Sequence, residues 1–193
     1  MLKIPLSPSR KPNVKAFPHT PMKIILETDR LYLRELNIQD SEDFYNLNLN
    51  PNVIRYTGNS AFKNIEEAKQ FLLNYQDYEL NGFGRWAVIE KENEEFLGWC
   101  GLKYDKGNNE TDIGFRFFEE KWNKGYATES AKACVEYGFE KLNLITIIGR
   151  TMKNNIASIK VLEKIGLQFV NEFDFDEANI GLIYKIENNK AFP

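Results

Sequence analysis

The fold of this chain is decided by the stretch Glu119-Glu120-Lys121-Trp122-Asn123-Lys124-Gly125-Tyr126-Ala127-Thr128-Glu129-Ser130. The β-branched and aromatic segment before it, residues 111–118, predicts a strand. After it, apolar residues recur at the spacing of a helix with one buried face: Ala127, Ala131, Cys134, Val135, Gly138 and Leu142. A polar turn holding one glycine therefore joins a strand directly to a helix.

A turn of this kind predicts an anion-binding site. It presents the unpaired N–H groups of the first helical turn, and the positive end of the helix dipole, to one point. Phosphate is the natural occupant of such a point. Gly125 lets the backbone approach the anion without a Cβ, Ala127 is small, and the Thr128 hydroxyl lies in the first turn. An ordinary connection with nothing bound is the alternative, because short glycine motifs have many false matches.

Two other phosphate loops are excluded. The pattern G-x-x-x-x-G-K-[ST] is absent, and Gly82-Phe83-Gly84 precedes a predicted strand rather than a helix. The segment 122–127 instead resembles the pyrophosphate loop of the GNAT N-acetyltransferase family, Arg/Gln-x-x-Gly-x-Gly/Ala. Trp122 departs from that general pattern. However, Trp-x-Lys-Gly-Tyr-Ala-Thr-Glu is similar to the variant in the RimJ/RimL-type branch, which includes acetyltransferases of ribosomal-protein N-termini.

Two more segments carry the same resemblance. Thr28-Asp29-Arg30-Leu31-Tyr32-Leu33-Arg34 resembles the Thr-x-Arg-Leu-x-Leu-Arg opening of that branch, although an edge strand explains it equally well. Residues 155–167 resemble the family's Asn-x-x-Ser-x-x-Val-Leu-Glu-Lys-x-Gly-Phe. Each motif is weak alone. Together, in the expected order, they cover nearly everything from Met22 onward, so the chain is identified as a member of the family.

Composition limits the class of protein. With 193 residues, 42% hydrophobic and 27% charged, the chain is long enough for one globular domain. We expect a proline-rich, extended leader at 1–21 and a single domain at 22–193. The net charge of −3 argues against nucleic acid or an anionic membrane as partner. The sequence shows neither the apolar core of a signal peptide nor an apolar run long enough to span a membrane. Cys100 and Cys134 lie in separate apolar segments and are expected to be buried free thiols. Together these features indicate a cytoplasmic protein.

The single histidine, His19, lies in the leader, so the predicted domain has no histidine. A Ser-His-Asp hydrolase and a His-Cys metal centre both need one and are therefore excluded. We therefore expect chemistry without a metal.

The order of elements predicts an α+β fold rather than a doubly wound sheet. The predicted strands lie at 24–33 (one strand with a polar interruption), 85–89, 96–102, 112–118, 144–148, 167–170 and 180–186. Predicted helices start at Asp40 and at a capping box formed by Asn64 and Glu67, and the late helix 155–165 is closed by Gly166. The Asn50-Pro51 pair is expected to end the first helix. The resemblance implies a mixed, mostly antiparallel twisted sheet, helices on both faces, and a splayed strand pair that binds the coenzyme.

The resemblance also implies a reaction, namely transfer of an acetyl group from acetyl-CoA to a primary amine by direct attack in a ternary complex. The acceptor, a protein N-terminus or a small molecule, stays open, and so does a homodimer. Coenzyme contacts are implied for Phe115, Phe117, Trp122, Asn123, Lys124, Gly125, Tyr126, Ala127, Thr128, Asn155 and Ser158. The amine must lose a proton, for which Asp112 and Glu110 are candidates, with a solvated carboxylate as the alternative for both.

Ser158 is the candidate for handling the leaving thiolate. Many members of the wider family place a tyrosine four residues after the position held by Ser158, whereas this chain has Leu162 there. A serine hydroxyl is a far weaker acid than a thiol, so we expect Ser158 to hydrogen-bond the sulfur as it gains charge. A serine that caps or packs within its own helix is the alternative. Two other functions also remain open: a CoA-binding sensor without transfer activity, and a structural domain with an empty turn.

Overall fold

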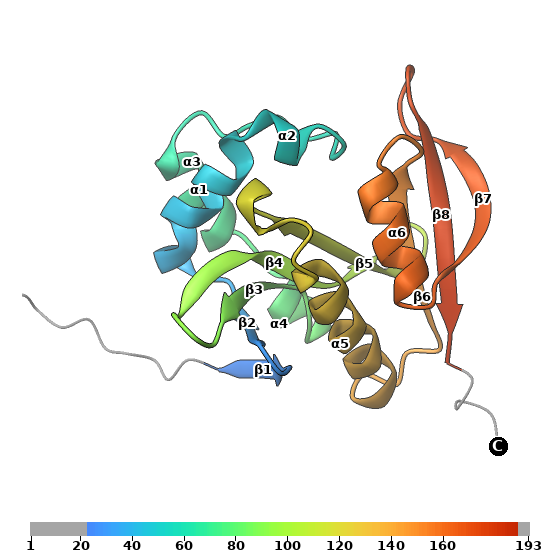
Figure 1. The fold of residues 1–193 in the computed structure, drawn as a ribbon, viewed down its shortest axis with the longest axis horizontal. Coiled ribbons are helices and arrows are strands. Elements are labelled where there is room, and N and C mark those ends of the chain that lie inside the picture. Colours follow the sequence, from blue (N-terminus) through green and yellow to red (C-terminus); the bar gives the residue numbers. More distant parts are fainter. Residues whose placement is uncertain (1–22, 189–193) are drawn as a thin grey trace, which may run out of the picture.

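A computed structural model describes residues 23–188, and the predicted leader lies outside the described residues. Its centre is an eight-stranded sheet of order β1-β2-β3-β4-β5-β6-β8-β7 (Figure 1). The strands are β1 (Ile24–Glu27), β2 (Leu31–Glu35), β3 (Arg85–Glu90), β4 (Glu95–Asp105), β5 (Glu110–Phe117), β6 (Thr146–Met152), β7 (Gln168–Asp174) and β8 (Ile180–Glu187). The helices are α1 (Ser41–Leu49), α2 (Pro51–Ile54), α3 (Ile65–Leu73), α4 (Asp77–Asn81), α5 (Tyr126–Glu140) and α6 (Ile156–Lys164). Short 3₁₀ turns lie at Ile38–Asp40 and Glu119–Lys121.

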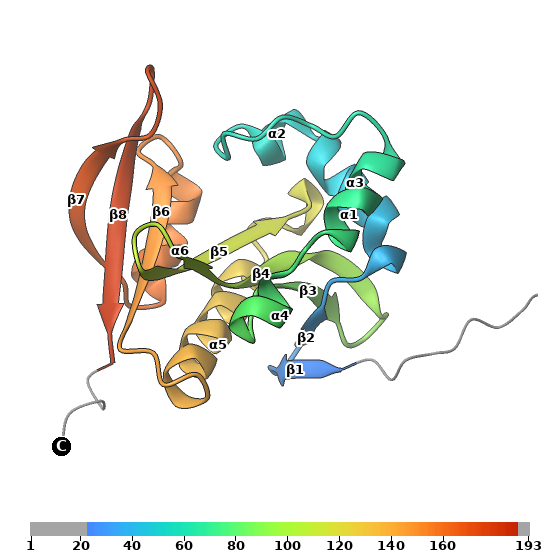
Figure 2. The same ribbon diagram turned by 180° about the vertical axis from the view of Figure 1, so that it is seen from behind.

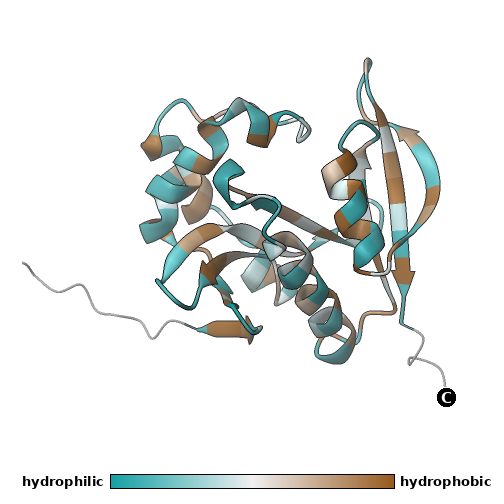
Figure 3. Ribbon diagram, in the orientation of Figure 1, coloured by the Kyte–Doolittle hydropathy of each residue, from teal (hydrophilic) through white to brown (hydrophobic). Residues whose placement is uncertain are grey.

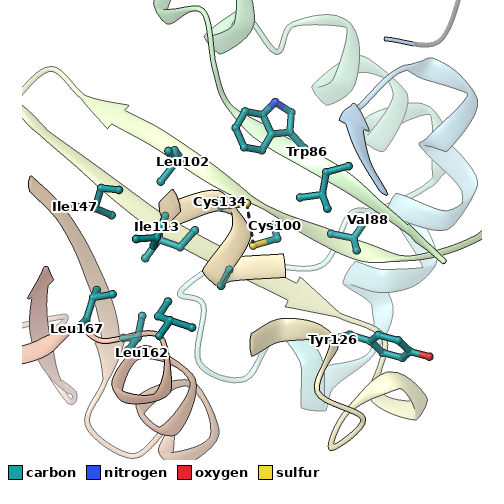
Figure 4. Packing of buried hydrophobic residues seen from close by; sticks show 14 of the residues in the cluster. Trp86, Val88, Cys100, Leu102, Ile113, Tyr126, Cys134, Ile147, Leu162 and Leu167 are labelled. Atoms are coloured by element: carbon teal, nitrogen blue, oxygen red, sulfur yellow. Dashed lines mark hydrogen bonds between the residues drawn. The ribbon is translucent and has the colours of Figure 1, made fainter. Parts of the chain in front are cut away.

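Helices cover both faces of the sheet, as predicted. The helices α5 and α6 pack on one face over a cluster that includes Leu102, Ile113 and Ile147. Figure 4 shows Cys100 of β4 and Cys134 of α5 facing each other inside this cluster. The helices α1, α2 and α3 pack on the opposite face over a second cluster. Teal and brown residues alternate along α1 and α5 in Figure 3, because each helix buries only one side.

The sheet is antiparallel everywhere except at β5 and β6, which run parallel and share a single bridge, Asp112 to Ile148. Beyond that point the two strands diverge, and the view from behind in Figure 2 shows the same separation as Figure 1. From there β6 continues by pairing with β8, while β5 continues by pairing with β4. The predicted α+β fold with a splayed strand pair is therefore confirmed.

The N-terminal region corrects the prediction of one interrupted strand. Residues 24–35 form an antiparallel hairpin, β1 and β2. Its turn depends on Thr28, whose hydroxyl accepts a hydrogen bond from the Leu31 amide at 3.1 Å. Apolar residues on both sides of a four-residue polar gap, residues 27–30, fit either arrangement, so the sequence pattern alone does not separate them.

The helices α1 and α3 start where predicted, after Asp40 and Asn64, but their caps differ in part from the prediction. Asp40 makes no cap hydrogen bond to α1; its carboxylate accepts from the Asn37 amide at 2.8 Å and pairs with Arg34 at 2.6 Å. Asn64 caps α3 as predicted, but Glu67 accepts from the Lys63 amide and so does not complete the predicted capping box. Two short helices, α2 and α4, were not predicted. Pro51 begins α2, because a proline suits the first position of a helix.

Candidate active site

The turn before α5 has the geometry that its sequence predicts. Gly125 is the N-terminal cap of α5 with φ +85°, a left-handed conformation that favours glycine. The first α-helical bond runs from the Glu129 amide to the Gly125 carbonyl at 3.0 Å. The amides of Tyr126, Ala127 and Thr128 therefore have no partner within the helix. Since Asn123, Lys124 and Gly125 are exposed, this cluster of N–H groups is accessible from solvent.

A long-range clamp holds the turn in place. The Glu129 carboxylate accepts from the Thr28 hydroxyl at 2.6 Å and from Arg30 Nε at 2.8 Å. Arg30 also donates to the Lys124 carbonyl at 3.1 Å, and its guanidinium lies 4.6 Å from the centroid of the Tyr126 ring. The opening motif around Thr28 and the turn motif thus form one unit. Sequence reasoning missed this contact because 99 residues separate Arg30 from Glu129.

Two predicted coenzyme-binding side chains bond within the protein. The indole Nε1 of Trp122 donates to the carbonyl of Phe117 at 2.9 Å and so fixes the end of β5 to the turn. The Tyr126 side chain is buried and its hydroxyl donates to Glu90. Both side chains thus stabilise the turn. The groups that remain available to an anion are the backbone amides at the start of α5.

Along β5 the structure offers backbone rather than side chains to a ligand. The side chains of Phe115 and Phe117 pack into the cluster beneath α5. One edge of β5 pairs with β4 over its whole length. Within residues 23–188, the other edge is bridged only at Asp112. Beyond Asp112 that edge can therefore pair with a peptide-like chain.

Both candidate carboxylates carry an arginine partner. Asp112 Oδ2 lies 2.7 Å from Arg85, and Glu110 pairs with Arg150. The Arg85 side chain extends from β3 across Gly114 of β5. A Cβ at position 114 would lie only 2.7 Å from Arg85 Cζ, so the arginine needs a glycine there. In each of these two carboxylates, therefore, one oxygen is already in contact with a guanidinium.

At the start of α6, Asn155 and Ser158 are brought together. The Asn155 side chain caps the helix by accepting from the Ser158 amide at 3.2 Å. In the part of the chain that the structure describes, the Ser158 hydroxyl makes no hydrogen bond, so it does not back-bond to its own helix. Helices α5 and α6 lie on the same face of the sheet, beside the diverging strands (Figure 1).

The opposite face carries residues that the sequence did not single out. Arg116 of β5 donates to the side-chain oxygens of Asn48, in α1, and Asn59, in the loop after α2, the latter at 3.1 Å. That loop reaches the β7–β8 turn, since an ideal Cβ at Gly58 would lie 3.2 Å from the Phe175 ring. No local signal marks Arg116, because an arginine within a strand is ordinarily a solvated one.

Comparison with known proteins agrees with this geometry. Residues 30–168 match the family described as the acetyltransferase (GNAT) domain. The chain belongs to the GNAT acetyltransferase family. An uncharacterized N-acetyltransferase p20 of Bacillus licheniformis is 31% identical over 145 residues, which cover 74% of this chain and 82% of that protein. The predicted family is confirmed, and this GNAT protein is an enzyme, an acetyltransferase.

Two solved GNAT structures share the fold. The ribosomal-protein-S5-alanine acetyltransferase from Vibrio fischeri has a TM-score of 0.74 at 17% identity and covers 87% of this chain and 98% of its own. The spermidine N-acetyltransferase from Vibrio cholerae, in complex with CoA and spermine, has a TM-score of 0.70 at 20% identity, covering 85% and 99%. Among residues 23–188 of this GNAT protein, no helix is long and apolar enough to cross a membrane. The same residues contain no group of His, Cys, Asp and Glu side chains that could hold a metal.

Proposed function

We propose that this GNAT protein transfers the acetyl group of acetyl-CoA to a primary amine by direct attack in a ternary complex. The observation that carries the proposal is the combination of the glycine turn before α5 with the unpaired edge of β5. The turn suits the pyrophosphate, and the edge suits the amide groups of pantetheine. Both lie along one path, from the end of β5 back to its divergence from β6.

The residues present fit this coenzyme. An ideal Cβ at Gly125 would meet only the Arg30 guanidinium, at 3.4 Å, so the space in front of the turn is open. Within residues 23–188 the Lys124 side chain has no acidic partner and can approach a phosphate. Glu129, the only acidic residue in the first turn of α5, is neutralised by Arg30 at 2.6 Å and does not oppose the anion.

The reaction requires three tasks of the protein. A backbone N–H near the divergence polarises the acetyl carbonyl as the amine nitrogen bonds to it and the C–S bond breaks. The amine loses its proton to water held by Asp112, whose Oδ2 is occupied by Arg85, whereas Oδ1 has no hydrogen-bond partner within residues 23–188. The Ser158 hydroxyl donates a hydrogen bond to the sulfur as it becomes negative, and solvent then supplies the thiol proton.

Two substitutions test the coenzyme site. Gly125→Glu places a Cβ and a like charge against the phosphates, so we expect the affinity for CoA to fall at least tenfold while the fold survives. Gly82→Glu is the matched control: it also substitutes a glycine with positive φ, +77°, in open space, but away from the turn. Calorimetric titration with CoA measures both. Unchanged binding by the Gly125 variant would remove the assignment.

A CoA-binding sensor without transfer activity is the competing function. Steady-state release of free thiol from acetyl-CoA, measured against panels of peptides and small amines, separates the two. Transfer to any amine supports the enzyme, and tight binding without turnover supports the sensor. The named acceptors of the two neighbours, a ribosomal-protein alanine and spermidine, justify including both panels. We place the protein in the cytoplasm, where buried thiols such as Cys100 and Cys134 stay reduced.

A further inference from the structure

Arg116 is a partly buried cation without an anion. Among the described residues, no carboxylate lies within the 4.0 Å that defines an ion pair with its guanidinium. Its partners are two neutral amide oxygens, of Asn48 and Asn59. An arginine has more N–H donors than these two bonds use. By contrast, the buried Arg34 and the partly buried Arg85 are each paired with a carboxylate.

Burial and a neighbouring cation both oppose the charge of Arg116. Burial, together with the charge of Arg85, lowers the pKa of Arg116 to about 10. The side chain is still charged at neutral pH, so within residues 23–188 this face holds a positive charge that no carboxylate compensates. Charges removed from water are ordinarily paired, and an unpaired one costs folding free energy.

A second donor without a partner lies next to it. Trp99 of β4 is the cross-strand neighbour of Arg116, and the guanidinium groups of Arg116 and Arg85 lie 5.3 and 5.6 Å from its ring centroid. The indole Nε1 of Trp99 is buried and has no hydrogen-bond partner within residues 23–188. Buried donors without partners are rare in proteins, and an absent ligand is one of their ordinary explanations.

We propose that Arg116, assisted by Trp99, binds a carboxylate carried by the acceptor amine. This inference rests on the proposed acetyl transfer and specifies its substrate class: amines that also bear a carboxylate, rather than polyamines. A carboxylate is planar and accepts several hydrogen bonds at once, which suits a guanidinium beside an indole N–H. A polyamine would place further positive charge beside Arg116 and Arg85.

The position of Arg116 limits the size of the acceptor. Arg116 and Asp112 lie on the same face of β5, four residues apart, because side chains in a strand alternate between faces. At about 3.3 Å per residue their Cα atoms are about 13 Å apart. The amine must reach the divergence beside Asp112, so amine and carboxylate are separated by no more than about that distance. An amino acid, or the first residues of a peptide with an acidic side chain, spans it.

Matched acceptors test the inference through a ratio. Thiol release from acetyl-CoA is measured with β-alanine, γ-aminobutyrate and ε-aminohexanoate, each paired with the alkylamine that lacks only its carboxylate. A peptide pair with glutamate or glutamine as second residue distinguishes a peptide source from a small molecule. The wild-type protein should prefer the carboxylate-bearing member of at least one pair by roughly 10- to 100-fold in kcat/KM, mainly through KM.

Variants of Arg116 test whether this residue causes the preference for carboxylate-bearing acceptors. Arg116→Met should reduce the ratio to near one, and Arg116→Lys, which keeps the charge, should retain part of it. Because the ratio compares two acceptors on one variant, partial unfolding cancels. Arg55→Met is the control, since Arg55 also stacks on an aromatic ring, at 5.2 Å from that of Tyr56, but is exposed.

Three results would overturn the inference. Equal kcat/KM within every pair for the wild-type protein would show that the carboxylate is not read. A preference that survives in Arg116→Met would place recognition elsewhere. Failure to bind acetyl-CoA in calorimetry, or to release thiol with any amine, would instead refute the proposed acetyl transfer and remove this inference with it.

Discussion

At the level of single residues, the position of the turn before α5 depends on the carboxylate of Glu129. Burial alone would raise the pKa of Glu129, but hydrogen bonds from Thr28 and Arg30 outweigh it and hold the pKa below its ordinary value of 4.5. A lowered pKa means that the folded state favours the charged carboxylate. Glu129 therefore stabilises the protein at neutral pH and joins the first hairpin to the turn.

Glu129→Gln should lower the free energy of unfolding by about 1–2 kcal/mol at neutral pH, since Arg30 is half exposed and its contribution is screened. The stabilising effect is fully present above the unfolded-state pKa and is lost as the pH falls through the lowered folded-state pKa. Urea unfolding of both proteins should thus show a difference that shrinks below about pH 4.5. A difference independent of pH would show that the charge of Glu129 does not matter.

Ser158→Ala should lower kcat and change the affinity for acetyl-CoA little. The hydroxyl has no internal hydrogen bond within residues 23–188, so its loss removes only a bond to the sulfur. We expect a decrease near the lower end of the about 10²–10⁴-fold that positioned acid–base groups contribute. Ser41→Ala is the control, because that hydroxyl bonds to the Ile38 carbonyl at the start of α1. Full kcat in Ser158→Ala, when chemistry limits the rate, would contradict the role.

At the level of elements, a buried ion pair attaches the start of α1 to the sheet. Arg34 of β2 and Asp40, at the end of the turn that leads into α1, pair at 2.6 Å with side chains 10% and 5% exposed. Asp40 also accepts from the Asn37 amide. The pair thus fixes the direction in which the chain leaves the sheet.

Asp40→Asn should destabilise the protein by about 3–5 kcal/mol, because it leaves the Arg34 charge buried and uncompensated. Glu35→Gln removes a carboxylate from an exposed pair with Lys23, at 3.6 Å, and should cost less than about 1 kcal/mol. Denaturant unfolding of the two variants compares them directly. Equal losses would show that the buried pair contributes no more than a surface one.

The elements that could be predicted were those with local signals. The turn before α5 was recognisable because a glycine, a β-rich segment and an apolar stripe follow one another within one stretch. The cap at Asn64 was recognisable too, because an asparagine directly before an apolar stripe is itself a local signal. The first hairpin was not, because its turn is closed by hydrogen bonds between Thr28 and Leu31, one of them to the threonine side chain, and no glycine or proline marks it. The contacts of Glu129 with Thr28 and Arg30 could not be predicted, because they join segments far apart in the sequence. The same holds for the surroundings of Arg116, which come from α1 and from the loop after α2.

At the level of the whole molecule, the two thiols belong to the core between β4 and α5. Cys100 and Cys134 are buried with their sulfur atoms 3.7 Å apart. Burial, with the hydrogen bond to Cys100, raises the pKa of the Cys134 thiol. A protonated thiol is a poor nucleophile and a poor metal ligand. The sulfur atoms therefore serve as small apolar groups between β4 and α5.

The double variant Cys100→Ala, Cys134→Ala should keep kcat within about twofold and lose about 1–3 kcal/mol of stability from the shortened side chains. Chelator treatment of the wild-type protein should leave turnover intact, as the residue content of the sequence predicts. Thiol release and thermal unfolding measure the two effects separately. Loss of turnover on chelation alone would show that the class of reaction has been misassigned.

The single bridge between β5 and β6 has a thermodynamic consequence. The five strands β1 to β5 and the three strands β6 to β8 meet along a seam between β5 and β6. Within residues 23–188, backbone pairing across this seam is limited to that single bridge. A coenzyme that lies in this seam would act as a missing strand, so part of its binding energy would also be folding energy. By mass action, saturation at about 100 times the dissociation constant would add about 2.7 kcal/mol to stability. On this view the sheet of this GNAT protein is completed by its substrate, and its resistance to heat rises and falls with the supply of acetyl-CoA.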